Sequence, residues 1–182
     1  MLKPSERWAW YFCDEEEHLM LDLGSDMVFK TKLKSKSLVD CAFHSNSFTV
    51  DDASDYQIFC ESTSILRLSN ARRAELVLNC VAARRFYKPV QPKSWFFNSQ
   101  SDSIRSPPSQ GEIIGLANDL GRGHFIILES GQVSSLCLCI EPKGFSLSES
   151  KTLWFSDVIK VMHDRIGSPK LSLNNKVLSM VG

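Results

Sequence analysis

The sequence predicts an α+β protein with two domains: an N-terminal α/β domain, built from an antiparallel meander and a buried helix, and a C-terminal β-barrel-like domain with a final helix. Three observations support this fold class. One long apolar run without Gly or Pro fits a helix, short strand-like runs lie before and after it, and a Ser-, Pro- and Gln-rich stretch separates the two patterns. We therefore expect domains at residues 1–97 and 112–182, joined by a flexible connection at residues 98–111.

Composition limits the classes of function. The chain has 182 residues, 43% of them hydrophobic, and its 21 basic side chains balance 21 acidic ones. A neutral chain is not steered toward nucleic acid or membrane surfaces. No segment reaches the about 20 apolar residues of a membrane span, and the N-terminus lacks the apolar core of a secretory signal. The six cysteines form no C-x-x-C pair, so we expect reduced cytosolic thiols.

The N-terminal domain is expected to begin with a meander of three strands. They are Trp8–Phe12, Leu19–Leu23 and Met27–Leu33, with polar turns between them. In and after the third strand, lysines recur at every second position and would share one face: Lys30, Lys32, Lys34 and Lys36. The favoured interpretation is a solvated strand edge protected by lysines. The alternative is a basic stripe that contacts an acidic partner.

A short helix is expected to follow Asp52, whose side chain would cap it. The neighbouring Asp51 raises the alternative of a metal site or an acid–base pair. No nearby histidine or third carboxylate completes such a site, so capping is the preferred interpretation.

The residues from Ala71 to Phe86 predict a helix of about five turns, which Ser69 can cap. Most of its faces are apolar, so other elements should cover it on most sides. Two prolines then end the helix and keep the chain extended. This exit carries Lys88, Lys93 and Trp95, and we expect it to be the working surface.

Basic and aromatic side chains alternate from Arg84 to Phe97, and no acidic residue interrupts them. This combination also occurs in proteins that bind single-stranded nucleic acid. The patch is short, the chain is neutral, and no nucleic-acid-binding motif accompanies it, so a contact with a protein or an acidic peptide is preferred. The remaining alternative is that the aromatics form a core between the domains, which we expect for Phe96 at least.

The C-terminal domain is expected to be rich in short strands. Strands are predicted at residues 112–117, 124–129, 133–141 and 145–147. Their spacing favours a small barrel or a curled antiparallel sheet. Ser156 and Asp157 would then cap a final helix that runs to Ile166. The tail, residues 170–182, would add a strand or stay unpacked.

Motifs of catalysis are missing from the sequence. It contains no P-loop, no G-x-S-x-G, no H-E-x-x-H and no Cys/His cluster with metal-ligand spacing, and its four histidines are scattered. We therefore expect no enzyme, no cofactor and no metal site. On residues alone, the prediction stops at a cytosolic two-domain interaction protein.

Several segments match a known family in order and spacing. They are W-x-W-Y from Trp8, L-M-L-D-L from Leu19, V-D-D-A from Val50, A-E-L-V-L-N from Ala74, K-P-V-Q-P-K-S-W from Lys88, E-S-G from Glu129 and D-V-I-K-V-M-H-D-R from Asp157. Together they resemble the bacterial cell-division ZapC family, over residues 1 to about 166. None of these motifs is chemically diagnostic alone, so the resemblance rests on their order and spacing.

The resemblance implies a cytosolic, non-enzymatic factor that acts at the mid-cell Z-ring. It implies direct binding to FtsZ, a tubulin-like GTPase, with lateral bundling of FtsZ protofilaments and a lower GTPase activity. It also implies a central pocket in the N-terminal domain. The alternative function is therefore a small-ligand or peptide-binding module that uses this pocket, with Asp22, Asp51 or Asp52 in its lining.

Five residues are candidates for partner binding: Leu21, Lys88, Lys93, Trp95 and Arg165. Basic and apolar patches would offset the repulsion between acidic FtsZ filaments. A monomer needs two FtsZ-contacting surfaces to cross-link filaments, whereas a dimer needs one. We expect a monomer, with self-association left open. Leu21 carries the alternative of being a core residue.

Overall fold

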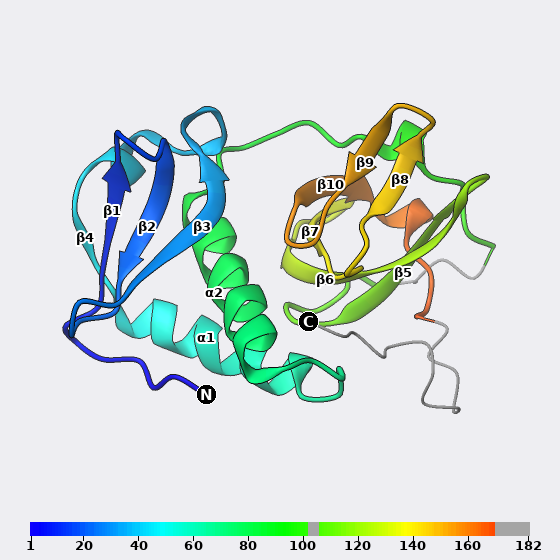
Figure 1. The fold of residues 1–182 in the computed structure, drawn as a ribbon. Helices are drawn as coiled ribbons and strands as arrows, with labels where there is room; N and C mark the ends of the chain where they lie inside the picture. The colour runs from blue at the N-terminus through cyan, green and yellow to red at the C-terminus, as the bar shows by residue number, and fades with distance from the viewer. Residues whose placement is uncertain (102–105, 170–182) are drawn as a thin grey trace. The chain divides into compact units, whose positions relative to one another are not determined.

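The computed structural model describes residues 1–101 and 106–169. The chain divides into two compact units, one of residues 1–61 and 70–89 and the other of residues 62–69 and from 90 onward. Helices and antiparallel sheets are both present (Figure 1), so the predicted α+β class is confirmed. The contacts assign residues 90–97 to the second unit, whereas the sequence placed the division after residue 97.

The first unit contains a four-stranded antiparallel sheet in the order β3-β2-β1-β4. Its strands are β1 (Ala9–Cys13), β2 (His18–Asp22), β3 (Val28–Lys34) and β4 (Asn46–Ser47). The predicted meander of β1, β2 and β3 is confirmed. Sequence analysis missed β4, because two residues are too few to show alternation.

The lysines of β3 alternate with buried residues, as the sequence predicted. Thr31 and Leu33 are 2% and 3% exposed, and the lysines between and beside them are exposed. β3 lies at an edge of the sheet. There the buried Asn79 accepts a hydrogen bond from the Lys32 backbone N–H at 2.8 Å, which satisfies a donor of the open edge. The extension of the stripe to Lys36 is wrong, because Lys36 lies in a 3-10 turn.

Two helices complete the first unit. In Figure 1, α2 (Asn70–Phe86) runs beside the sheet and contacts β3. It is buried continuously over residues 76–83, so the predicted buried helix is confirmed. α1 (Val50–Thr63) is a 14-residue helix. Its cap is Thr49 and not Asp52: Thr49 Oγ1 accepts from the Asp52 N–H at 3.1 Å, and Asp52 Oδ2 accepts from the Thr49 N–H at 2.9 Å. This reciprocal pair is a capping box.

The second unit is built on a four-stranded antiparallel sheet in the order β10-β7-β6-β5 and a two-stranded sheet of β8 and β9. The strands are β5 (Ile113–Asn118), β6 (Gly121–Ser130), β7 (Ser134–Cys139), β8 (Phe145–Ser148), β9 (Lys151–Leu153) and β10 (Val158–Met162). The described strands of this unit form these two sheets and no closed barrel.

An aromatic cluster occupies the core of the second unit. Phe97 stacks on Phe145 at 5.8 Å between ring centroids, and Phe125 packs edge-on against Phe145 at 5.7 Å. Cys137 and Cys139 are free, buried thiols in the same cluster. The sequence predicted reduced thiols. Desolvation by burial raises the pKa of the Cys137 thiol.

The predicted final helix is wrong. Val158–Met162 forms β10 and pairs antiparallel with β7, and only His163–Arg165 forms a short 3-10 turn, η4. Burial alternates along β10, with Ile159 and Val161 facing the core. The segment is rich in β-branched residues, which fit a pleated sheet better than a helix. Its apolar spacing fits both periods, and pairing with β7 decides between them. The prediction for the tail, residues 170–182, lies outside the described residues.

Candidate functional site

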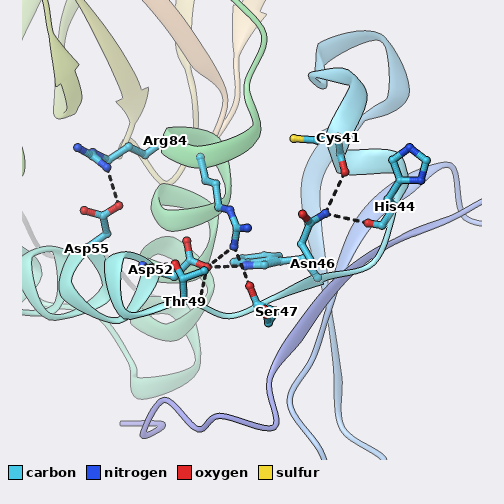
Figure 2. Close-up of polar contacts among 10 residues, drawn as sticks. Cys41, His44, Asn46, Ser47, Thr49, Asp52, Asp55 and Arg84 are labelled. Carbon is cyan, nitrogen blue, oxygen red and sulfur yellow. Dashed lines mark hydrogen bonds and ion pairs between the residues drawn. The ribbon is translucent and has the colours of Figure 1, made fainter.

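The end of α2 is anchored inside the first unit by ion pairs (Figure 2). Arg85 Nη1 donates to Asp52 Oδ2 at 2.5 Å and to the Ser47 carbonyl oxygen at 2.9 Å. Trp10 Nε1 donates to the same Asp52 oxygen at 3.1 Å, and the Thr49 N–H donates to it at 2.9 Å. Asp52 is 2% exposed. One buried carboxylate of α1 therefore joins β1 and α2, and Arg85 extends the network to β4.

The preceding arginine is paired in the same way. Arg84 Nη1 lies 2.8 Å from Asp55 Oδ2, and the Asp55 side chain is 9% exposed. Two of the four basic residues between 84 and 97 are thus neutralised by carboxylates of α1. The basic character that the sequence assigned to this region is carried at the surface by Lys88 and Lys93, both of which are exposed.

The chain leaves the first unit at Lys88, whose backbone N–H donates to the Ser37 carbonyl oxygen at 2.8 Å. In the second unit, the 3-10 turn η3 (Ser94–Phe96) is held on β10 and η4. The Lys93 N–H donates to the Lys160 carbonyl at 2.8 Å. The Met162 N–H donates to Ser94 Oγ at 2.8 Å.

Arg165 is held against the same turn. Its Nε donates to the Ser94 carbonyl at 3.2 Å and its Nη1 donates to Ser99 Oγ. An ion pair with Asp164 at 3.7 Å adds a weaker contact. The structure therefore brings Lys93, Trp95 and Arg165, which were candidates from the sequence, to one part of the second unit.

An aromatic pair, of which Trp95 is the exposed member, completes this surface. Trp95 is 70% exposed, and its ring centroid lies 5.6 Å from that of Phe96. Lys151 Nζ lies 5.3 Å from the Phe96 ring, in cation–π contact. Phe96 is partly buried against the core of the second unit. We call Lys93, Trp95, Phe96, Lys151 and Arg165 the η3 surface.

Sequence reasoning missed Lys151, because it lies far along the chain from Trp95 and reaches the surface only through strand β9. A tryptophan exposed beside cations is typical of interface hot spots, which are enriched in Trp, Tyr and Arg. Of the three candidates in the exit from α2, Lys88 lies in the first unit, whereas Lys93 and Trp95 lie in the second.

Leu21 is not at a surface. It is 0% exposed in the middle of β2, where it pairs with Trp10 on one side and Phe29 on the other. A partner could reach it only if the sheet opened, so the structure supports the alternative that Leu21 is a core residue.

The three acidic residues that were predicted to line a pocket have different surroundings. Asp22 Oδ1 accepts from the Gly24 N–H in an exposed turn, Asp51 is exposed on α1, and Asp52 is buried among its donors. Within residues 1–101 and 106–169, no group of three or more Asp, Glu, His or Cys side chains could hold a metal ion. No helix in this part of the chain is long and apolar enough to cross a membrane.

Comparisons with known proteins cover both units. A family model described as the N-terminal part of cell-division protein ZapC matches residues 1–88, and one described as its C-terminal part matches residues 89–171. Among the relatives, the cell division protein ZapC of Vibrio cholerae is 53% identical over 181 residues, which are 100% of this chain and 99% of that protein. The Vibrio vulnificus protein is 52% identical over the full length of both chains. The Proteus mirabilis protein is 38% identical over 98% of this chain and 100% of its own length.

Proposed function

Since this chain belongs to the ZapC family of cell-division proteins, we propose that it binds FtsZ, bundles FtsZ protofilaments and stabilises the Z-ring at the division septum. A role in cell division follows from the family itself. The η3 surface is the observation that supports the finer proposal, because it presents the exposed Trp95 together with three basic side chains.

The chemistry of the η3 surface suits an acidic filament with apolar side chains on it. Lys93, Lys151 and Arg165 offer positive charge, and the Trp95 ring offers a large apolar area that is solvated in the free protein. Arg165 and the backbone of η3 are already fixed by hydrogen bonds, so little conformational entropy is lost on binding.

Bundling by a monomer requires a second contact surface. Because Leu21 is buried, we assign that role to the exposed lysines of β3 and to Lys88, all of which lie in the first unit. Lys30 is ion-paired with Glu16 at 2.6 Å, but both side chains remain about half exposed. Such a pair contributes little and leaves the lysine open to a stronger partner.

A lower GTPase activity requires no contact with the nucleotide. Filaments held side by side exchange subunits more slowly, and slower exchange reduces GTP turnover. The alternative, a ligand-binding module in the first unit, has less support because Asp52 already accepts bonds from Thr49, Trp10 and Arg85. We do not propose an enzymatic activity.

The test is sedimentation of purified FtsZ with GTP, with and without this protein, together with phosphate release. We expect more FtsZ in the pellet, co-pelleting of this protein, and slower phosphate release. Lys93→Glu should weaken all three effects. Lys143→Glu makes the same change of charge at an exposed turn outside the η3 surface and is the matched control. Unchanged pelleting and turnover with the wild-type protein would end the FtsZ proposal.

A further inference from the structure

A chain of side-chain hydrogen bonds in the second unit ends at His163. Ser130 Oγ lies 2.5 Å from the Pro108 carbonyl oxygen and 2.9 Å from Ser135 Oγ. Ser135 Oγ in turn lies 2.8 Å from His163 Nε2. The direction of these bonds can be worked out, because a carbonyl oxygen only accepts and each hydroxyl has a single proton to donate.

The carbonyl sets the direction. Pro108 can only accept, so Ser130 donates its one proton there. Ser130 Oγ must then accept from Ser135, which uses the only proton of Ser135. Ser135 Oγ is left to accept from His163, so Nε2 carries a hydrogen and Nδ1 of the neutral ring carries a lone pair. Ser135 is 0% exposed, so water does not compete with His163 for the Ser135 hydroxyl.

His163 also lines an open groove with a volume of about 380 Å³. The lining residues are Ser106, Pro107, Gln132, Val133, Met162, His163 and Asp164. Among the lining residues that the structure describes, none carries a permanent positive charge. The Asp164 carboxylate is 62% exposed, and its ion pair with Arg165 is long, at 3.7 Å. Val133 supplies apolar surface and is 61% exposed. The His163 N–H donates to the Val133 carbonyl at 2.9 Å, which ties the two walls together.

We propose that this groove, the His163 groove, binds a lysine side chain of a partner protein. The methylene chain would lie against Val133 and Met162. The ammonium would donate to His163 Nδ1 and pair with the Asp164 carboxylate. The His163 ring bonds Ser135 through Nε2. Within the described residues, Nδ1 has no hydrogen-bond partner and could accept a bond from a ligand. The groove adjoins the η3 surface through the Asp164–Arg165 ion pair but shares no residue with it, so this inference goes beyond the FtsZ proposal.

The first experiment tests the tautomer on the full chain. Two-bond ¹H–¹⁵N NMR at mildly alkaline pH distinguishes a neutral ring protonated at Nε2 from one protonated at Nδ1. We expect the proton of His163 on Nε2, and a mixture of tautomers in Ser135→Ala. A wild-type ring with its proton on Nδ1 would overturn the proposal.

The second experiment tests the ligand. The probe is acetyl-Gly-Lys-Gly-amide, and its control is the same peptide with an acetylated lysine side chain. We expect saturable NMR shifts at the His163 ring and the Val133 and Met162 methyls with the first peptide only. Because only part of the His163 rings in Ser135→Ala would carry their proton on Nε2, probe binding should weaken in proportion to the fraction lost, about 2-fold for an equal mixture of tautomers.

A surface variant keeps the test valid if Ser135→Ala fails to fold. Asp164→Asn removes one charge from an exposed side chain and should weaken probe binding about 2- to 5-fold. Asp26→Asn makes the same change in an exposed turn of the first unit and should have no effect. Equal binding of the acetylated peptide, absence of saturable shifts, or equal behaviour of the two variants would each refute the lysine site.

Discussion

Replacing Asp52 with asparagine should destabilise the first unit while its neighbour Asp51 tolerates the same change. Asp52 Oδ2 accepts from Arg85, Trp10 and Thr49, and the residue is 2% exposed. At the N3 position of the capping box, an asparagine side-chain oxygen can still accept from the Thr49 N–H, so that hydrogen bond is retained. What Asp52→Asn removes is the charge opposite the Arg85 guanidinium.

The magnitude follows from burial. Removing one partner of a fully buried ion pair costs about 3–5 kcal/mol. The Arg85 side chain is 26% exposed, so water compensates it in part, and we expect a loss of about 2–3 kcal/mol for Asp52→Asn. Asp52→Ala should lose about 1 kcal/mol more, because the hydrogen bond from the Thr49 N–H is then removed as well. Asp51 is exposed in the same helical turn, so Asp51→Asn should cost no more than about 0.5 kcal/mol.

The assay is urea unfolding followed by tryptophan fluorescence. Trp8 and Trp10 are buried in the first unit, whereas Trp95 and Trp154 lie in the second. A background with Trp95→Phe and Trp154→Phe therefore reports on the first unit alone. For a unit of this size, about 2–3 kcal/mol corresponds to a melting point lower by about 10–20 °C. If Asp52→Asn and Asp51→Asn unfold within about 0.5 kcal/mol of each other, the structural role assigned to Asp52 is wrong.

Three further predictions concern the surface and the thiols. Trp95→Ala should weaken FtsZ binding about 30-fold, which is the effect of losing a hot-spot residue that contributes about 2 kcal/mol. The control Trp154→Ala removes another exposed tryptophan and should leave binding unchanged. Equal losses in the two variants would show that exposed tryptophans act nonspecifically. The contribution of Lys93 to FtsZ affinity should decrease above about 0.15 M salt, where the screening length falls below about 8 Å. The FtsZ affinities of Lys93→Glu and the wild-type protein should therefore converge at high salt. A constant difference in affinity would indicate a buried contact instead. At pH 8 a thiol reagent should label the exposed Cys41 and leave Cys139 unlabelled. Burial raises the pKa of the Cys139 thiol to about 12, so this thiol stays protonated. Labelling of Cys139 in mass spectra of the native protein would show that it is not buried.

Local pattern was sufficient where one period dominates. The long run without Gly or Pro gave α2, and the alternation of Thr31 and Leu33 with lysines gave β3. It was not sufficient where two periods fit. Val158, Ile159 and Met162 fit a helical stripe, whereas Ile159 and Val161 fit the buried face of a strand, and the backbone of β7 supplies the hydrogen bonds that select the strand. That partner lies about twenty residues earlier and is invisible to a local reading.

The candidate surface was predictable only in part for the same reason. Lys93 and Trp95 could be found from the proline-bounded exit that follows α2. The contact of Lys151 with Phe96 depends on the β8–β9 hairpin, and the place of Arg165 depends on η4. The ion pairs of Arg84 and Arg85 could not be predicted, because the sequence shows their charges but not the carboxylates of α1 that neutralise them.

The ion pairs of Arg84 and Arg85 also explain why the proposed binding surface lies in the segment after Pro89 and not on α2. Carboxylates of α1 hold the last turn of α2, so charge at that end serves the fold of the first unit. After Pro89 the chain bonds to the second unit through Lys93 and Ser94, which fixes the backbone on either side of Trp95 while its ring stays 70% exposed. A large ring on a fixed backbone loses little entropy when a partner covers it. Substituting Ser94 should therefore weaken FtsZ binding without removing any group that contacts FtsZ.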